Sequence, residues 1–145
     1  MKKSHVVLHH SLTKDSGTVS WGAIRRFHVE TQGWTDIGYH LGIEDVGGRY
    51  EVLLGRPLGA DGAHAYQGGM NRIGLGVLFV GNFDEAPPPQ EMLILAARHL
   101  RDLVEVLGIP IDRSHVIGHR EVAAYKSCPG RMFDLEHFVR LLEEA

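Results

Sequence analysis

Of the residues whose side chains can hold a metal ion, we single out four as candidates: His9, His10, His119 and the single cysteine, Cys128. Zinc binds imidazole nitrogen and thiolate sulfur at about 2.0–2.3 Å, and a catalytic zinc site has three protein ligands and a fourth position for water. Two histidines and one cysteine satisfy that requirement. Their spacing alone does not identify them, because they are scattered along the chain instead of forming the close pairs of a zinc ribbon.

Each of these residues also has a purely structural interpretation. A strand histidine is commonly hydrogen-bonded within the fold, and a lone cysteine commonly behaves as a small buried hydrophobe. His119, which precedes Arg120 and Glu121, also fits an exposed helix start. A further alternative makes Cys128 a nucleophile with His119 as its general base. The sequence has no G-x-S-x-G elbow, no Walker A loop and no H-E-x-x-H motif, which excludes those three kinds of site.

The predicted strands place the candidate ligands near strand ends. These strands cover residues 5–10, 37–44, 49–54, 73–80 and 115–118. Residues 37–54 form a hairpin with a turn at Gly47-Gly48, and the glycine-rich stretch 55–72 is a long loop of the kind that is usually functional. His9 and His10 thus end one strand, and His119 follows another.

Three predicted helices separate these strands. Ser20 caps the first, which has Trp21, Ile24 and Phe27 on one face and ends at Gly33. A 3.6-residue apolar period predicts a second helix after Pro88-Pro89, ending at Gly108. The third helix follows the capping residue Asp134. Its inward-facing side chains are Leu135, Phe138, Leu141 and Leu142. The pattern predicts one α/β domain over residues 1–145, with a central mixed β-sheet flanked by helices.

The composition excludes several other classes of protein. The 145 residues carry a net charge of −3 with no basic stripe, so we expect no nucleic acid partner. No apolar run reaches the ~18–20 residues of a membrane span, so we expect no membrane insertion. The apolar run Val6-Val7-Leu8 is too short for a signal peptide, which predicts a protein that is cytoplasmic as synthesised.

A series of short motifs runs through most of the chain. They are Leu8-His9-His10-Ser11, Gly33-Trp34, Ile37-Gly38-Tyr39-His40-Leu41, Gly62-Ala63-His64-Ala65, Asn71-Arg72-Ile73-Gly74, Gly81-Asn82-Phe83, Gly118-His119-Arg120-Glu121 and Lys126-Ser127-Cys128-Pro129-Gly130. In this order the series resembles the zinc-dependent N-acetylmuramoyl-L-alanine amidases, and within them the short phage lysozyme-type enzymes. Peptidoglycan recognition proteins share the same fold. The resemblance extends from about Val6 to Phe138 and implies an amidase-like fold.

The resemblance also implies a set of functional residues. They are the Zn²⁺ ligands His9, His119 and Cys128, the catalytic residues Tyr39 and Lys126, and the substrate-groove residues His64 and Asn71. Strand alternation does not choose between His9 and His10. The family pattern does, because its ligand directly follows the apolar strand. Zinc lowers the pKa of its bound water to about 7, and the resulting hydroxide would attack the amide carbonyl while Lys126 and Tyr39 stabilise the developing charge.

The implied function is hydrolysis of the amide bond between N-acetylmuramic acid and L-alanine, with peptidoglycan or muropeptides as partners. The alternative from another class is a peptidoglycan-binding module without activity, and Cys128 argues against it because such relatives typically lack the zinc cysteine. Two biological roles fit the enzyme. A phage or prophage endolysin would reach the wall after membrane permeabilisation, and a recycling amidase would cleave wall fragments in the cytoplasm. The small size of the chain and its resemblance to the short phage enzymes favour the endolysin.

Overall fold

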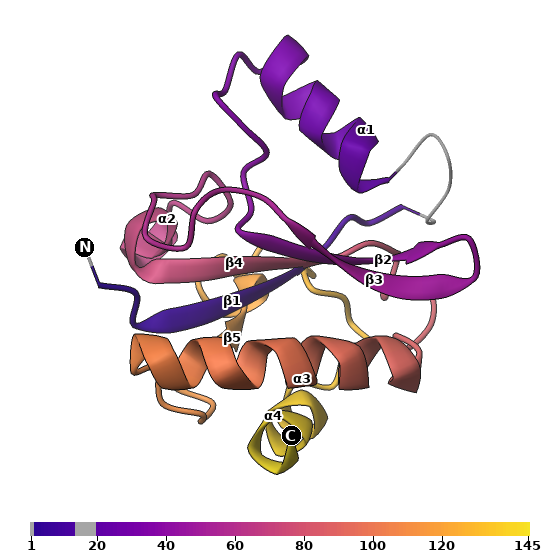
Figure 1. Cartoon of the computed structure of the whole chain (residues 1–145), viewed down its shortest axis with the longest axis vertical. Helices are drawn as coiled ribbons and strands as arrows, with labels where there is room; N and C mark the ends of the chain where they lie inside the picture. Colours follow the sequence, from indigo (N-terminus) through magenta and orange to yellow (C-terminus); the bar gives the residue numbers. More distant parts are fainter. Residues whose placement is uncertain (1, 14–19) are drawn as a thin grey trace.

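A five-stranded mixed sheet forms the centre of the fold, with helices on both faces (Figure 1). The computed structural model describes residues 2–13 and 20–145. The strand order is β3-β2-β4-β1-β5; β1 is parallel to β4 and β5, β2 is parallel to β4, and β3 is antiparallel to β2. The strands are β1 (His5–His10), β2 (Leu41–Val46), β3 (Arg49–Leu54), β4 (Gly74–Phe79) and β5 (Val116–Gly118). The predicted mixed sheet flanked by helices is confirmed.

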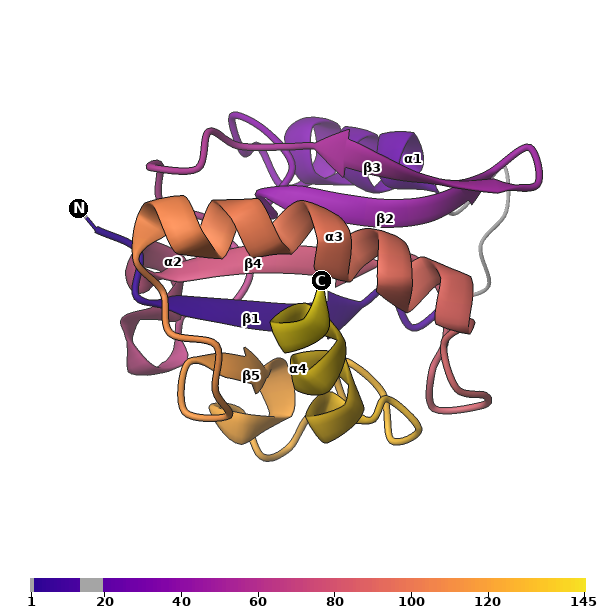
Figure 2. The same cartoon turned by 60° about the horizontal axis from the view of Figure 1, so that its bottom comes forward.

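Two helices cover one face of the sheet and build the main core (Figure 2). They are α3 (Gln90–Leu107), which follows Pro89, and α4 (Leu135–Glu144). Gly108 ends α3 in the left-handed conformation, and the Asp134 carboxylate caps α4 by accepting the His137 backbone N–H at 3.0 Å. The apolar side chains of both helices form one buried cluster with side chains of β1, β2, β4 and β5, and each buried large side chain stabilises the fold by roughly 1.5–3 kcal/mol.

The other face carries shorter helices. They are α1 (Trp21–Arg26), the π-helical turn Phe27–Thr31, a 3-10 turn (Gln67–Gly69) and α2 (Met70–Ile73). The Ser20 hydroxyl caps α1 as predicted, accepting the Ala23 backbone N–H at 3.3 Å. The side chains predicted to share one face differ in exposure, since Trp21 is buried whereas 51% of Phe27 is exposed. At 100° per residue, Phe27 lies about 120° from Trp21 around the helix, at the margin of the buried stripe.

Two predicted segments differ from the structure. The strand expected from residue 37 begins at Leu41, and the loop expected over 55–72 contains the 3-10 turn and most of α2. Among the described residues, no helix combines the length and apolar character needed to cross a membrane.

Candidate metal centre

The sheet register places His9 beside His119. Leu8 of β1 lies opposite Gly118, the last residue of β5. The next residue in each segment is a histidine: His9 within β1, and His119 at the start of a 3-10 turn (His119–Glu121). The two imidazole rings are 4.7 Å apart between centroids. His10 points to the opposite face, where its Nδ1 accepts the Phe83 backbone N–H at 3.1 Å. His10 is therefore a structural residue, and His9 faces the candidate site.

Cys128 completes a group of three possible ligands. One ligand atom each from His9, His119 and Cys128 lies within 4.8 Å of the other two. The His9 Nδ1 and the Cys128 Sγ are 3.5 Å apart. Tetrahedral zinc with ordinary Zn–N and Zn–S bond lengths separates nitrogen and sulfur ligands by about 3.5 Å. The donor atoms and their spacing fit a zinc ion.

Two glycines let the Cys128 loop approach the sheet closely. A Cβ on Gly118 would lie 2.7 Å from the Pro129 ring, and a Cβ on Gly130 would lie 2.6 Å from the Phe83 backbone. Gly130 also has a φ of +125°, which side chains disfavour. These close contacts explain why glycines flank the histidine and cysteine motifs at these positions.

Arg120 lies in the 3-10 turn His119–Glu121, which directly follows β5, and it holds the Cys128 loop against this turn. Its backbone N–H donates to the Cys128 carbonyl at 2.7 Å, and its guanidinium donates to the carbonyls of Gly130 at 2.6 Å and Phe133 at 3.3 Å. Since Arg120 is adjacent to His119, these bonds fix the position of one candidate ligand relative to another.

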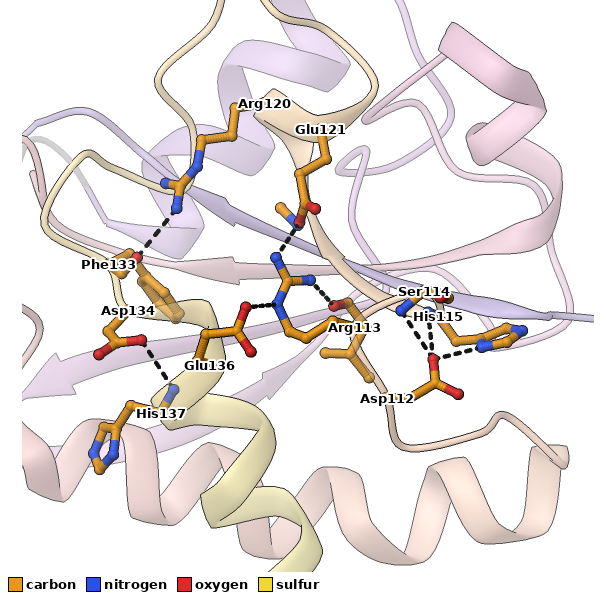
Figure 3. A network of polar contacts seen from close by, with 12 residues as sticks. Asp112, Arg113, Ser114, His115, Arg120, Glu121, Phe133, Asp134, Glu136 and His137 are labelled. Atoms are coloured by element: carbon orange, nitrogen blue, oxygen red, sulfur yellow. Dashed lines mark hydrogen bonds and ion pairs between the residues drawn. The ribbon is translucent and has the colours of Figure 1, made fainter.

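Glu121 belongs to this supporting network and not to the site itself. Its carboxylate accepts the Gly118 backbone N–H at 2.9 Å and the Arg113 guanidinium at 2.8 Å, while Arg113 also donates to Glu136 at 3.1 Å (Figure 3). Of the described residues that line the cavities at the metal centre, none carries a carboxylate.

The three candidate ligands line a cleft of about 530 Å³, which joins a groove of about 280 Å³ through shared residues. Tyr39 and Lys126 line the same cleft. The Tyr39 ring lies 5.1 Å from the His9 ring, and the exposed Lys126 ammonium lies 5.6 Å from the centre of the Tyr125 ring. The structure thus brings both predicted catalytic residues to the candidate ligands. The shared residues are Trp34, Ala63, His64, His119, Tyr125 and Lys126.

The predicted groove residues His64 and Asn71 both line the groove and also contact the protein interior. The His64 Nδ1 lies 2.9 Å from the His9 Nε2, and the His64 Nε2 lies 3.2 Å from the Gly74 carbonyl oxygen. The Asn71 side-chain oxygen accepts the backbone N–H groups of His64 at 2.7 Å and Ala65 at 2.8 Å. Asn71 therefore fixes the backbone that carries His64.

Burial sets the protonation states of these groups. It lowers the pKa of His64 to about 3 and that of His119 to about 4, and it lowers the pKa of His9 well below its usual value. The imidazoles are therefore neutral, as metal ligands must be. Burial also raises the pKa of the Cys128 thiol to about 12, so a nearby cation is needed to hold the thiolate. This raised pKa is the opposite of what a nucleophilic thiolate requires. The pKa of Tyr39 is raised as well, by burial and then by Cys128.

Two further residues at the site, Gln67 and His28, are not predicted by the sequence. The Gln67 amide donates to the Tyr125 hydroxyl at 2.8 Å, and its oxygen lies 3.5 Å from the His119 Nε2. His28 lines the cleft, and its Nδ1 accepts the Gly38 backbone N–H at 3.0 Å. Burial lowers the pKa of His28. Gln67 lies in the predicted loop and His28 in the predicted first helix, and no local pattern marks either one.

Comparisons with known proteins agree with this arrangement. The model of the family "N-acetylmuramoyl-L-alanine amidase" matches residues 1–131. The endolysin of Klebsiella phage KP32 is 35% identical over 136 residues, which cover 93% of this chain and 84% of that protein. The structure of the amidase LysC from Clostridium intestinale has a TM-score of 0.81 at 26% identity, covering 99% of this chain and 87% of that one. The structure of a Drosophila PGRP-LB mutant in complex with tracheal cytotoxin has a TM-score of 0.76 at 28% identity. The match covers 94% of this chain and 80% of that one.

Proposed function

The chain belongs to the N-acetylmuramoyl-L-alanine amidase family, and we propose that it hydrolyses peptidoglycan with a zinc ion held by His9, His119 and Cys128. The bond cleaved joins N-acetylmuramic acid to the L-alanine of the stem peptide. The substrate is peptidoglycan or a muropeptide, in line with the PGRP-LB complex with tracheal cytotoxin. Residues 1–145 act as one catalytic domain.

The main support for this proposal is that three side chains of the kinds that bind zinc lie together in one cleft. The ligand atoms come from residues 9, 119 and 128, yet they lie within 4.8 Å of one another, and the nitrogen–sulfur distance of 3.5 Å suits a tetrahedral ion. Three protein ligands leave a fourth position open, which is the arrangement of catalytic zinc.

The roles of the remaining cleft residues follow from their chemistry. When bound, zinc supplies Lewis acidity and a nucleophile that is available at neutral pH. The Lys126 ammonium provides positive charge where the amide oxygen becomes negative, and the Tyr39 hydroxyl provides a hydrogen-bond donor. The pKa of Tyr39 lies above its usual value, so the hydroxyl keeps its proton and can donate. With no carboxylate among the described lining residues, Tyr39 and His28 are the candidates to handle protons.

An endolysin is the biological role that fits best. The phage endolysin compared above is matched over 93% of this chain and 84% of its own length. In this role the protein is made in the cytoplasm and reaches the wall after the membrane has been permeabilised.

Digestion of purified cell walls tests the proposed function. We expect mass spectrometry to find free stem peptides with an N-terminal L-alanine, together with glycan strands that have lost their peptides. Removal of metal with a chelator should abolish product formation, and added zinc should restore it. Binding to walls without any peptide release would instead identify a non-catalytic peptidoglycan-binding module. Activity that survives complete metal removal would contradict the zinc mechanism.

A further inference from the structure

His64 lies directly behind the candidate ligand His9, on the side away from Cys128. The two ring nitrogens of His9 face different partners. The His9 Nδ1 lies 3.5 Å from the Cys128 Sγ, and the His9 Nε2 lies 2.9 Å from the His64 Nδ1. On its other side, the His64 ring forms a hydrogen bond to the Gly74 carbonyl oxygen, which lies 3.2 Å from the His64 Nε2. Both rings are buried, with 2% of His9 and 9% of His64 exposed. One line of hydrogen-bonding atoms therefore runs from the backbone of β4 to the candidate metal centre.

The positions of the protons along this line follow from its fixed end. A carbonyl oxygen only accepts, so the His64 Nε2 must carry the proton in the bond to Gly74. A neutral His64 then has a bare Nδ1, which accepts the hydrogen bond that the His9 Nε2–H donates. A neutral His9 in that tautomer has its lone pair on Nδ1, the atom that faces the Cys128 sulfur.

We propose that His64 is a positioning residue for the metal centre, which holds His9 in the tautomer and ring orientation that present a bare Nδ1 to the metal. This inference rests on the proposed zinc site. Metal-ligating histidines generally donate their other ring N–H to a fixed acceptor, and loss of that acceptor typically lowers metal affinity by about 10–100-fold.

The surroundings of His64 fit this role because they leave its ring little freedom. A Cβ on Gly76 would lie 2.6 Å from the ring and a Cβ on Gly62 would lie 2.4 Å from it, so both positions require glycine. Asn71 holds the His64 backbone through two hydrogen bonds. The ring is therefore fixed before any metal binds.

A pair of substitutions separates the two hydrogen bonds that His64 makes. His64→Asn places an oxygen near the position of Nδ1 and can still accept from His9, whereas His64→Gln reaches toward Gly74 and offers nothing at that position. We expect His64→Gln to weaken zinc binding by about 10–100-fold and His64→Asn by no more than about threefold, measured by competition with a chelator of known affinity.

His40 provides the matched control. His40 is also buried, accepts the Gly76 backbone N–H at 2.9 Å and donates to the Ala60 carbonyl at 2.8 Å, but among the described contacts no hydrogen bond joins it to His9. His40→Gln should therefore leave zinc affinity within about threefold of the wild type. Equal losses in His64→Gln and His40→Gln would overturn the proposal, since the effect would then reflect general packing. Unchanged zinc binding by His64→Gln would also overturn it.

A measurement on the unaltered protein does not depend on how any variant folds. In the ¹⁵N NMR spectrum of the metal-free wild type, we expect the His9 Nε2 to be protonated and the His9 Nδ1 to be bare. A His9 protonated mainly at Nδ1 would overturn the inference and leave the zinc site standing. A wild-type protein that takes up no zinc would overturn the zinc site, and the inference with it.

Discussion

A methyl group added at Gly76 tests whether β4 must leave room for His64. Gly76 lies in the middle of β4, opposite Val7 of β1, and both strands are interior to the sheet. In Gly76→Ala, the new Cβ would lie 2.6, 2.7 and 2.9 Å from three atoms of the His64 ring. Ordinary contacts begin near 3.4 Å, so the ring or the strand must move by about half an ångström or more.

Neither partner can move without losing hydrogen bonds. His64 is held by His9, Gly74 and Asn71, and the Gly76 backbone N–H is held by His40. Overpacking of this kind typically costs about 1–3 kcal/mol of unfolding free energy. At this chain length a loss of 1 kcal/mol lowers Tm by about 2–4 °C, so we expect Tm to fall by about 2–12 °C. Displacement of His64 from His9 should also weaken zinc binding by about tenfold or more.

Thermal unfolding of the metal-free protein and a zinc competition titration measure the two effects. Gly59→Ala is the matched control, because a Cβ there meets nothing within 4 Å and the backbone is not in the left-handed region. We expect the control to change stability by less than about 0.5 kcal/mol and to bind zinc like the wild type. A Gly76→Ala protein with wild-type Tm and wild-type zinc affinity would refute the reasoning.

Four further outcomes are expected. Cys128→Ser should lose most of its zinc and nearly all activity, because a hydroxyl replaces the thiolate ligand. Metal analysis and wall-turbidity assays measure these losses. A zinc-replete, fully active variant would exclude Cys128 as a ligand. Tyr39→Phe should retain zinc while kcat falls by about 10²–10³, since one donor to the developing charge is removed; an unchanged kcat would rule out that role. Lys126→Met should likewise retain zinc and have a lower kcat. Lys126→Arg keeps the positive charge and should therefore retain more of the wild-type kcat. Equal kcat values in the two variants would show that Lys126 does not act through its charge. The metal-free protein should become less stable as pH falls from about 6.5 to about 4. Burial lowers the pKa of His40 to about 4, so the unfolded chain binds the proton first, and the loss is at most about 1.4 kcal/mol per pH unit for such a histidine. Urea unfolding at pH 7 and pH 5 measures this change, and equal stabilities would contradict it.

The regular elements were predictable because their patterns are local. The apolar period of α3, the Asp134 cap of α4 and the strand β1 each depend on residues that are close in sequence. The four residues of α2 are too few to show a helical period, and its position depends on packing against β1 and β4. The irregular path before β2 likewise depends on contacts with distant segments, such as the bond between the His40 backbone N–H and the Gly76 carbonyl.

Fewer features of the candidate site could be predicted from local sequence patterns. Alternation separates His9 from His10 onto opposite faces, but only the packing of the folded chain shows that Phe83 covers the face of His10. The candidate ligand set came from the family resemblance, because no local spacing joins residues 9, 119 and 128. Gln67 was missed because its contacts with His119 and Tyr125 join segments about 50 residues or more apart.

X-ray absorption at the zinc edge tests the central claim most directly, because it reports the atoms bound to the ion. For stoichiometrically zinc-loaded protein, we predict one sulfur at about 2.3 Å and two imidazole nitrogens at about 2.0–2.1 Å, with a further light atom at the open position. A zinc shell without sulfur, or a protein that binds no zinc at stoichiometric amounts, would contradict the account.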